Sequence, residues 1–394
     1  MSQSTTGLAS ILRGRLDEDR LTARLQRLVR AASENPPGNE APAAELAAAM
    51  CEDAGLEVTV HEAEAGRPNV SARLGDGGRP RVVFCSHLDV VPAGDRSLWE
   101  RDPYAGDVAA GRLHGRGSAD AKGPCAAAIE AAGMLAAEAD LAGTLELLLV
   151  ADEEAMGSKG AGPLVSEGVV EADAAIVGEP TSLQVVRAQR GACWLRVTVR
   201  GRAAHGSAPE RGRNAILHMA EILSHLPGTL PPIEHPVLGG PSLNVGTIRG
   251  GEKINIVPAS CAIEIDRRTL PGEAPGDVIA AIESAVDSAR LRYPDLQAEV
   301  DLELSAEPFE IAEDAPLVTA MAEAVREVTG SLAALAGFRG ASDARFFAQT
   351  GIPVIVCGPG DISLAHTARE SVDLGEVRDA ALAYACAFAG LMRS

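Results

Sequence analysis

A histidine and an aspartate two positions apart follow a short apolar stretch of the chain. The segment Arg81–Val91 reads RVVFCSHLDVV, and its run Val82–Cys85 is typical of a buried parallel strand. His87 and Asp89 then lie at the carboxyl end of that strand, the edge where open α/β sheets bind ligands. A metal-bound histidine commonly donates its second ring N–H to a carboxylate, so this pair is a candidate metal site. Alone the tripeptide is weak evidence, because a structural histidine is the commoner explanation.

The same pattern recurs after three further apolar runs. These predicted strands are Leu145–Val150, Ala174–Val177 and Pro353–Cys357. The side chains that follow them are, in order, Glu153 and Glu154, Glu179, and His366. Asp120 lies in a tight Gly-rich loop before a helix, where a helix N-cap is the simpler explanation for an aspartate. Because parallel strands bring their carboxyl ends to one edge of a sheet, we expect these side chains to meet near His87.

Two histidines and several carboxylates, with no cysteine, suit zinc, or cobalt or manganese. Two metal ions about 3.5–4 Å apart can hydrolyse amides, since they lower the pKa of bound water from about 15.7 to about 7. Five ligands suffice: His87 and Glu179 for one metal, Glu154 and His366 for the other, and Asp120 between them. Two adjacent glutamates in a loop do not point the same way. One can therefore bind metal while the other faces the water as a general base, which contributes ~10²–10⁴ in rate.

The elements around these residues predict an α/β fold. Strands alternate with helices before residue 190 and after residue 306, which indicates a mostly parallel sheet with helices on both faces. Residues 191–305 instead show strands and two helices in a βαββαβ-like order. This pattern predicts an inserted α+β domain with a four-stranded antiparallel sheet. The expected domains are therefore 1–190 with 306–394, and 191–305.

Composition limits the partners and the compartment. The chain has 394 residues, enough for two domains, and its 55 acidic against 35 basic residues give a net charge of −20. This charge argues against nucleic acid or an anionic membrane as a partner. The seven cysteines form no C-x-x-C pair and fit reduced core positions. Without a signal-like or membrane-spanning stretch, we expect a cytoplasmic protein.

Taken in order, the motifs resemble those of a known family over nearly the whole chain. They include SHLDVVPAGD, HGRGSADAKG, ADEEAMGSKG, VGEPT, RGRAAHGSAPERGRNAI, GTIRGGEKINIVP, DRRTLPG, ASDARFFA and GPGDISLAHTARE. The chain resembles the dinuclear zinc amidohydrolases and peptidases, which comprise acetylornithine deacetylase, succinyl-diaminopimelate desuccinylase, aminoacylase-1 and carboxypeptidase G. The GPGDI-x-x-AHT run is most similar to acetylornithine deacetylase.

The resemblance implies a role for each candidate residue. The metal ligands would be His87, Asp120, Glu154, Glu179 and His366, with Asp120 bridging. Asp89 would orient His87, and Glu153 would be the general base and then the proton donor to the leaving amine. The metal centre would lie in the first domain, and the inserted domain would be a lid and a homodimerisation domain.

Residues for the substrate follow from the same resemblance. His205, in the inserted domain, would reach the other subunit's active site and polarise the scissile carbonyl. Asn255, Arg268 and Arg345 would surround the substrate, where guanidinium groups suit a carboxylate. By alternation along the strand, the neighbouring Arg267 is expected to be an outward-facing strand charge rather than a second anchor.

The sequence thus predicts hydrolysis of the amide bond of an N-acyl amino acid with a free α-carboxylate. An N-acetyl or N-succinyl group on a basic or diamino acid is favoured. The close alternative is a carboxypeptidase or dipeptidase on the same scaffold. A catalytically silent binding or scaffold protein would have lost a ligand or the base, and this chain retains all of them.

Overall fold

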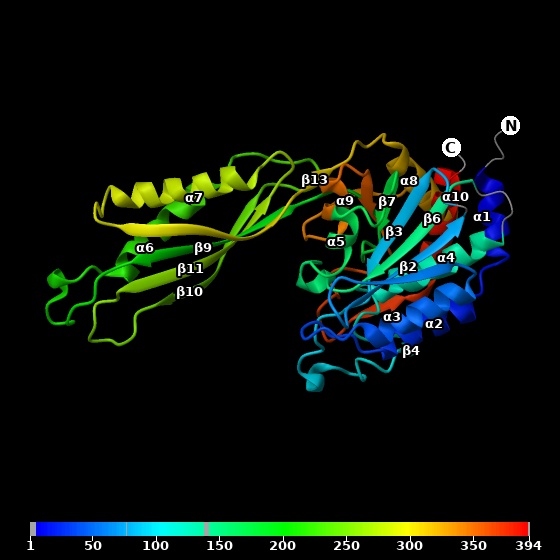
Figure 1. Ribbon diagram of the computed structural model, residues 1–394, viewed down its shortest axis with the longest axis horizontal. Helices are drawn as coiled ribbons and strands as arrows, with labels where there is room; N and C mark the ends of the chain where they lie inside the picture. Colours follow the sequence, from blue (N-terminus) through cyan, green and yellow to red (C-terminus); the bar gives the residue numbers. More distant parts are fainter. Residues whose placement is uncertain (1–4, 76, 138–141, 393–394) are drawn as a thin grey trace. The chain divides into compact units, whose positions relative to one another are not determined.

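The computed structural model describes residues 5–75, 77–137 and 142–392 of the chain. The chain forms two compact units (Figure 1). Unit 1 comprises residues 1–187, 311–336 and 342–394, and unit 2 comprises residues 188–310 and 337–341. The assignment of a catalytic role to one domain and a lid and dimerisation role to the other remains a prediction.

The sheet of unit 1 has four parallel strands at its centre. Its strands follow the order β1-β2-β6-β3-β7-β15-β8, and β6, β3, β7 and β15 are mutually parallel. Their bounds are β1 Glu57–Glu62, β2 Pro68–Gly75, β3 Arg81–His87, β6 Thr144–Val150, β7 Ala174–Val177, β8 Val185–Gln189 and β15 Val354–Val356. A small second sheet joins β4 (Asp107–Ala109), β5 (Arg112–His114) and β16 (Ser371–Asp373). The predicted, mostly parallel sheet is confirmed.

Both faces of the central strands are buried, which is why most of their residues are apolar. Phe84 of β3 packs against Tyr384, with ring centroids 4.9 Å apart, on the face covered by the long C-terminal helix. Val83 and Cys85 point to the opposite face and are also fully buried. A strand buried on both faces reads as a nearly continuous apolar run, as Val82–Cys85 of β3 does; in β6 the run is interrupted by Glu146, which accepts a hydrogen bond from Ser71.

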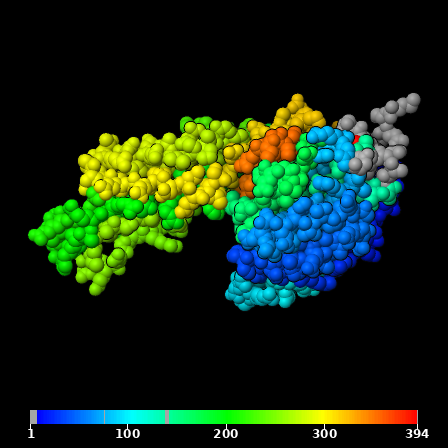
Figure 2. Space-filling model, in the orientation of Figure 1, coloured from blue at the N-terminus to red at the C-terminus, as the bar shows by residue number. Residues whose placement is uncertain are grey.

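Helices supply these layers. Their bounds are α1 Thr5–Arg13, α2 Glu18–Arg30, α3 Ala41–Asp53, α4 Lys122–Ala136, α5 Ala161–Ser166, α8 Pro316–Thr329, α9 Ala344–Gln349 and α10 Leu374–Met392. Asp17 caps α2 by accepting a hydrogen bond from the N–H of Arg20. Figure 2 shows the N-terminal segment, in blue, over much of the visible surface of unit 1.

Unit 2 is built on a four-stranded antiparallel sheet, as predicted. Its order is β10-β11-β9-β12, with bounds β9 Gly191–Arg200, β10 Ser242–Gly250, β11 Ser260–Thr269 and β12 Gln297–Ala306. The helices α6 (Ala215–His225) and α7 (Pro275–Arg290) pack on one face of the sheet and close its core. Short strands β13 (Phe309–Glu310) and β14 (Leu335–Phe338) lie where the chain leaves and re-enters the unit.

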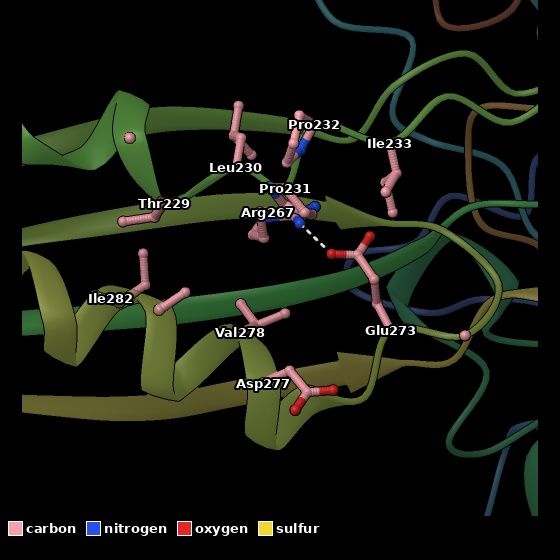
Figure 3. A pocket seen from close by; sticks show the side chains of 13 residues that line it. Thr229, Leu230, Pro231, Pro232, Ile233, Arg267, Glu273, Asp277, Val278 and Ile282 are labelled. Atoms are coloured by element: carbon pink, nitrogen blue, oxygen red, sulfur yellow. Dashed lines mark hydrogen bonds and ion pairs between the residues drawn. The ribbon is translucent and has the colours of Figure 1, made fainter.

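Arg267 in unit 2 corrects the sequence interpretation. It was expected to face outward, but it is only 3% exposed. Period-two alternation puts it on the same face as Ile263 and Ile265, and Glu273 in the turn before α7 neutralises it with an ion pair. The pair lines a cavity of about 450 Å³ beside α7 (Figure 3).

Within the described ranges, none of the helices combines the length and the apolar character that a membrane crossing requires.

Candidate metal centre

The four parallel strands of unit 1 deliver candidate ligands to one edge of the sheet. His87 is the last residue of β3, and Glu179 follows β7 by two positions. Glu153 and Glu154 begin a short 3-10 helix, η2 (Glu153–Ala155), after β6. His366 lies in the loop after β15. The convergence follows from parallel pairing, which aligns the carboxyl ends of β6, β3 and β7 in register.

The first group of donors is His87, Asp120 and Glu179. The Nε2 atom of His87 lies 3.1 Å from Oδ1 of Asp120 and 3.9 Å from Oε2 of Glu179. All three side chains are buried. Their ligand atoms lie within 4.8 Å of one another, so a single cation can contact all three.

The second group is Asp120, Glu154 and His366. The Nε2 atom of His366 lies 3.2 Å from Oδ2 of Asp120 and 3.2 Å from Oε2 of Glu154. These ligand atoms also lie within 4.8 Å of one another. Asp120 thus belongs to both groups and turns one oxygen toward each histidine, which is the geometry that a bridging carboxylate needs.

Electrostatics favour positive charge at this site. Burial alone would lower the pKa of His87, but hydrogen bonds to Asp120 and Asp89 outweigh it and raise that pKa well above its usual value. Hydrogen bonds to Asp120 and Glu154 raise the pKa of His366 to about 10. The carboxylates therefore stabilise a cation between the rings. Nitrogen and oxygen donors without sulfur fit zinc, cobalt or manganese.

Asp89 contacts both halves of the centre. Its backbone oxygen lies 2.9 Å from Nδ1 of His87, closer than its carboxylate Oδ1 at 3.4 Å. The carboxylate also accepts the backbone N–H of Glu153 at Oδ1 and that of Glu154 at Oδ2, at 3.2 and 3.1 Å. The main chain of Asp89 thus fixes the His87 ring, and its side chain fixes the turn that carries the two glutamates.

A buried polar network behind Asp89 was not predicted from the sequence. Asn35 donates from Nδ2 to Asp89 at 2.9 Å and to Asp152 at 3.3 Å. Arg67 pairs with Asp152 at 3.0 Å and donates two hydrogen bonds to Glu40. All five side chains are at most 5% exposed. The arginine offsets part of the acidic charge, which lets three carboxylates remain buried here.

Left-handed backbone conformations gather in the loops that hold the ligands. His366 has φ 61°, Asp152 has φ 71° and Met156 has φ 75°. Such conformations cost ~1–3 kcal/mol each for residues with side chains and cluster at functional sites. Their presence in the His366 loop and on both sides of η2 is consistent with loops shaped for ligand placement.

Glu153 differs from its neighbour Glu154. Among the described residues, no group donates a hydrogen bond to its carboxylate, whereas Glu154 contacts His366. Burial raises the pKa of Glu153 well above its usual value, with the nearby charges of Asp343 and Glu154 adding to the effect. A free carboxylate with a raised pKa beside a cation site has the properties of a general base.

Arg345 was predicted to contact substrate, and it lies in unit 1. It is 3% exposed and stacks on Phe346 at 4.4 Å. Its guanidinium donates to the backbone oxygens of Met156 at 2.8 Å and Ser342 at 3.2 Å. These bonds connect the N-terminus of α9 to the turn after Glu153.

The other predicted substrate residues belong to unit 2, whereas the candidate metal ligands belong to unit 1. His205 and Asn255 are on adjacent segments, since the N–H of Gly206 donates to the Asn255 oxygen at 2.8 Å. The Nδ1 atom of His205 accepts the N–H of Ser207 at 3.1 Å, which leaves the proton of a neutral ring on Nε2. Arg268 is half-buried in β11 and pairs with Asp266 at 2.9 Å.

A shared aspartate between two histidine–carboxylate groups, at the carboxyl edge of a parallel sheet, defines a class: the metal-dependent hydrolases with two adjacent ions. Comparison with known proteins agrees. The peptidase family M20/M25/M40 matches residues 83–389. The chain is 32% identical to a succinyl-diaminopimelate desuccinylase of Bordetella petrii over 326 residues, 78% of this chain and 82% of that one.

Two further relatives support the match. An acetylornithine deacetylase of Proteus mirabilis is 32% identical over 315 residues, covering 78% of this chain and 79% of that one. The fold resembles that of aminopeptidase PepT from Bacillus cereus, with a TM-score of 0.81 at 24% identity over 96% of this chain and 100% of that one. The chain belongs to the peptidase family M20/M25/M40 and is a hydrolase of amide bonds. The resemblance inferred from the motifs is confirmed.

Proposed function

We propose that this protein uses two divalent metal ions to hydrolyse the amide bond of an N-acyl amino acid with a free α-carboxylate. The observation that carries the proposal is the position of Asp120, with one carboxylate oxygen 3.1 Å from His87 and the other 3.2 Å from His366. Zinc is the metal that this donor set favours, with cobalt or manganese as alternatives. Unit 1 would be the catalytic domain.

Five residues would hold the two ions. His87 and Glu179 would bind one, Glu154 and His366 the other, and Asp120 both. When bound, the ions would polarise an amide carbonyl and lower the pKa of water. The backbone oxygen of Asp89 at Nδ1 of His87 keeps the ring tautomer whose Nε2 is free to bind metal.

Glu153 would move the protons of the reaction. Its carboxylate has no hydrogen-bond donor among the described residues, so it is free to accept a proton from the attacking water. The same carboxyl group would then donate that proton to the leaving amine nitrogen. A base in this position typically contributes ~10²–10⁴ in rate.

Arg268 is the stronger candidate for the α-carboxylate. It is half-buried, and its only side-chain partner among the described residues is Asp266, two positions away on the same strand. Arg345 already donates to two backbone oxygens. His205 carries its proton on Nε2 and could donate it to a scissile carbonyl, and Asn255, on the adjacent segment, would help position the substrate.

The substrate class follows from the named relatives. Proteins at 31–33% identity act, by their names, on acetylornithine and succinyl-diaminopimelate. A basic or diamino acid with an N-acetyl or N-succinyl group is therefore the proposed substrate. The small-molecule substrate and the acidic net charge of −20 agree with a cytoplasmic enzyme that has no nucleic-acid or membrane partner.

Unit 2 would be the lid and the homodimerisation domain. The strand β10 is at the edge of its sheet, where unpaired N–H and C=O groups are available to a second copy. Next to this edge strand in the chain, α6 exposes Leu217 by 54%, and β10 itself exposes Ile248 by 56%. Apolar side chains on an edge strand and a helix support association between copies.

A substrate panel tests the proposal. The purified protein, loaded with zinc or cobalt, is assayed with N-acetyl and N-succinyl derivatives of ornithine, lysine and diaminopimelate, and with unblocked dipeptides. The proposal expects the highest kcat/KM on an N-acyl amino acid. A preference for unblocked dipeptides would indicate the dipeptidase alternative. A preference for longer peptides, cleaved at their carboxyl end, would indicate a carboxypeptidase. No turnover of any amide would refute all three activities.

A further inference from the structure

Glu370 is a buried carboxylate directly behind the bridging aspartate. It is 1% exposed. Its Oε1 atom accepts three backbone N–H groups, from Gly117 at 2.9 Å and from Ala119 and Asp120 at 3.2 Å. Its Oε2 atom accepts a hydrogen bond from Arg116 at 2.5 Å. One side chain thus holds most of the loop that carries Asp120.

The loop also has backbone hydrogen bonds, such as Ser118 N–H to Gly115 at 3.1 Å and Lys122 N–H to Gly117 at 2.9 Å, but the N–H of Asp120 donates to Glu370. The loop lies between β5 and α4, and no side chain caps the N-terminus of α4. A carboxylate that gathers several N–H groups orients the peptide planes around itself, and charged acceptors make stronger hydrogen bonds than neutral ones. The N–H of Asp120 is one of the three, so the backbone of the bridging residue is fixed directly.

The same segment of chain carries a ligand of the second group. Glu370 follows His366 by four residues, and the N–H of Gly115 donates to its backbone oxygen at 3.1 Å. The backbone oxygen and the side-chain carboxylate of Glu370 therefore both accept hydrogen bonds from the loop that carries Asp120. This ties the distance between His366 and Asp120 to the contacts of Glu370.

Keeping a second carboxylate beside Asp120 is costly. Glu370 and Asp120 are both buried, 1% and 7% exposed, so two neighbouring carboxylates are removed from solvent here. Arg116 offsets the charge, and its guanidinium is itself stacked on Trp99 at 5.1 Å. An uncharged residue would avoid this cost, so the geometry that the carboxylate imposes is the feature that explains its presence.

We propose that Glu370 is a positioning residue that holds the Asp120 carboxylate between His87 and His366, so that both metal ions bind tightly. The proposal rests on the dinuclear centre of the proposed function. It predicts that loss of Glu370 weakens metal binding although no ligand is removed. Partners of metal ligands typically contribute 10–100-fold in metal affinity.

The test compares Glu370→Gln with wild type and with Glu130→Gln. Glu130 is an equally buried carboxylate, 0% exposed, that pairs with Arg24 at 2.6 Å and contacts none of the candidate ligands. Dissociation constants for two cobalt ions are measured by competition with a chromophoric chelator. Magnetic coupling between the two ions is followed by electron paramagnetic resonance, and thermal unfolding is recorded for each apo-protein.

For Glu370→Gln we expect a 10–100-fold weaker affinity for cobalt and reduced magnetic coupling between the two ions. Glu130→Gln should lose a similar amount of thermal stability but keep the wild-type metal affinity and coupling. Equal metal affinity and coupling in the two variants would overturn the proposal. Should Glu370→Gln not fold, Arg116→Met removes the partner of Oε2, together with the guanidinium contacts to Thr367 and Trp99, while the three backbone N–H groups stay on Oε1; it is expected to weaken the affinity up to tenfold. If Arg116→Met then binds metal as tightly as Glu130→Gln does, the proposal is overturned. If wild type binds no pair of metals, the proposed function itself fails.

Discussion

The most detailed prediction concerns Asp89→Asn. The two carboxylate oxygens accept different backbone donors, Oδ1 the N–H of Glu153 and Oδ2 the N–H of Glu154. An asparagine presents only one acceptor oxygen. Whichever way its amide turns, its NH₂ group faces one of the two N–H groups and leaves that donor unpaired. Removing one buried partner costs about 1–3 kcal/mol, so the free energy of unfolding should fall by that amount.

The effect on the metals should be unequal. The His87 ring is oriented by the backbone oxygen of Asp89 at 2.9 Å, which the substitution leaves in place. The turn that carries Glu153 and Glu154 loses one of the two hydrogen bonds that it donates to the side chain of Asp89. We therefore expect the affinity of the ion bound by Glu154 and His366 to fall 10–100-fold, and that of the ion bound by His87 and Glu179 to fall less than tenfold.

Single-site backgrounds make this measurable. Asp89→Asn is combined with His366→Ala, which leaves the first group, and separately with Glu179→Gln, which leaves the second. Metal affinity is then titrated in each pair by chelator competition. A control, Glu146→Gln, changes a buried carboxylate in β6 that accepts from Ser71 at 2.5 Å and should leave both affinities unchanged. A larger loss in the His366→Ala background would refute the reasoning.

Three further predictions follow from the site. Glu153→Gln should retain both ions and lose ~10²–10⁴ in kcat, whereas Glu154→Ala should lose an ion. Metal counting combined with kinetics distinguishes the two variants, and a near-normal rate for Glu153→Gln would mean that another residue is the base. Arg268→Ala should raise KM for acyl amino acids and weaken discrimination against their α-amides, which comparison of the two substrates checks; an unchanged preference would move the role to Arg345. His205→Ala and Glu153→Ala chains should each be nearly inactive alone. When equal amounts exchange subunits freely, about half of the dimers are mixed and each has one intact site, so about a quarter of wild-type site activity should return. No recovery would exclude an active site shared between two subunits.

Much of the fold could be predicted because it depends on local patterns. A strand buried on both faces is apolar at nearly every position, so Ala174–Val177 could be delimited to the residue. The same rule located the strand ends that carry His87 and Glu179. The outward orientation predicted for Arg267 is wrong because this residue is in phase with Ile263 and Ile265 on the inward face, where Glu273 pairs with its charge.

The supporting residues could not be predicted, since their roles depend on tertiary contacts. Charged side chains are rarely buried unless they are paired, and the partners of Arg67 and Glu370 lie far away in sequence. His366 lies in a loop with no periodic pattern, and only the motif indicated it. A weak signal for Glu370 existed, because it ends the same motif four residues after that histidine.

The proposed metal centre requires two ions that share Asp120. Anomalous diffraction at the zinc edge, from crystals of the zinc-loaded protein, tests this directly. We expect two peaks, one contacted by His87 and Glu179 and the other by Glu154 and His366, with a carboxylate oxygen of Asp120 on each. A single peak in a fully active, metal-saturated enzyme, or two peaks that other residues bind, would contradict it.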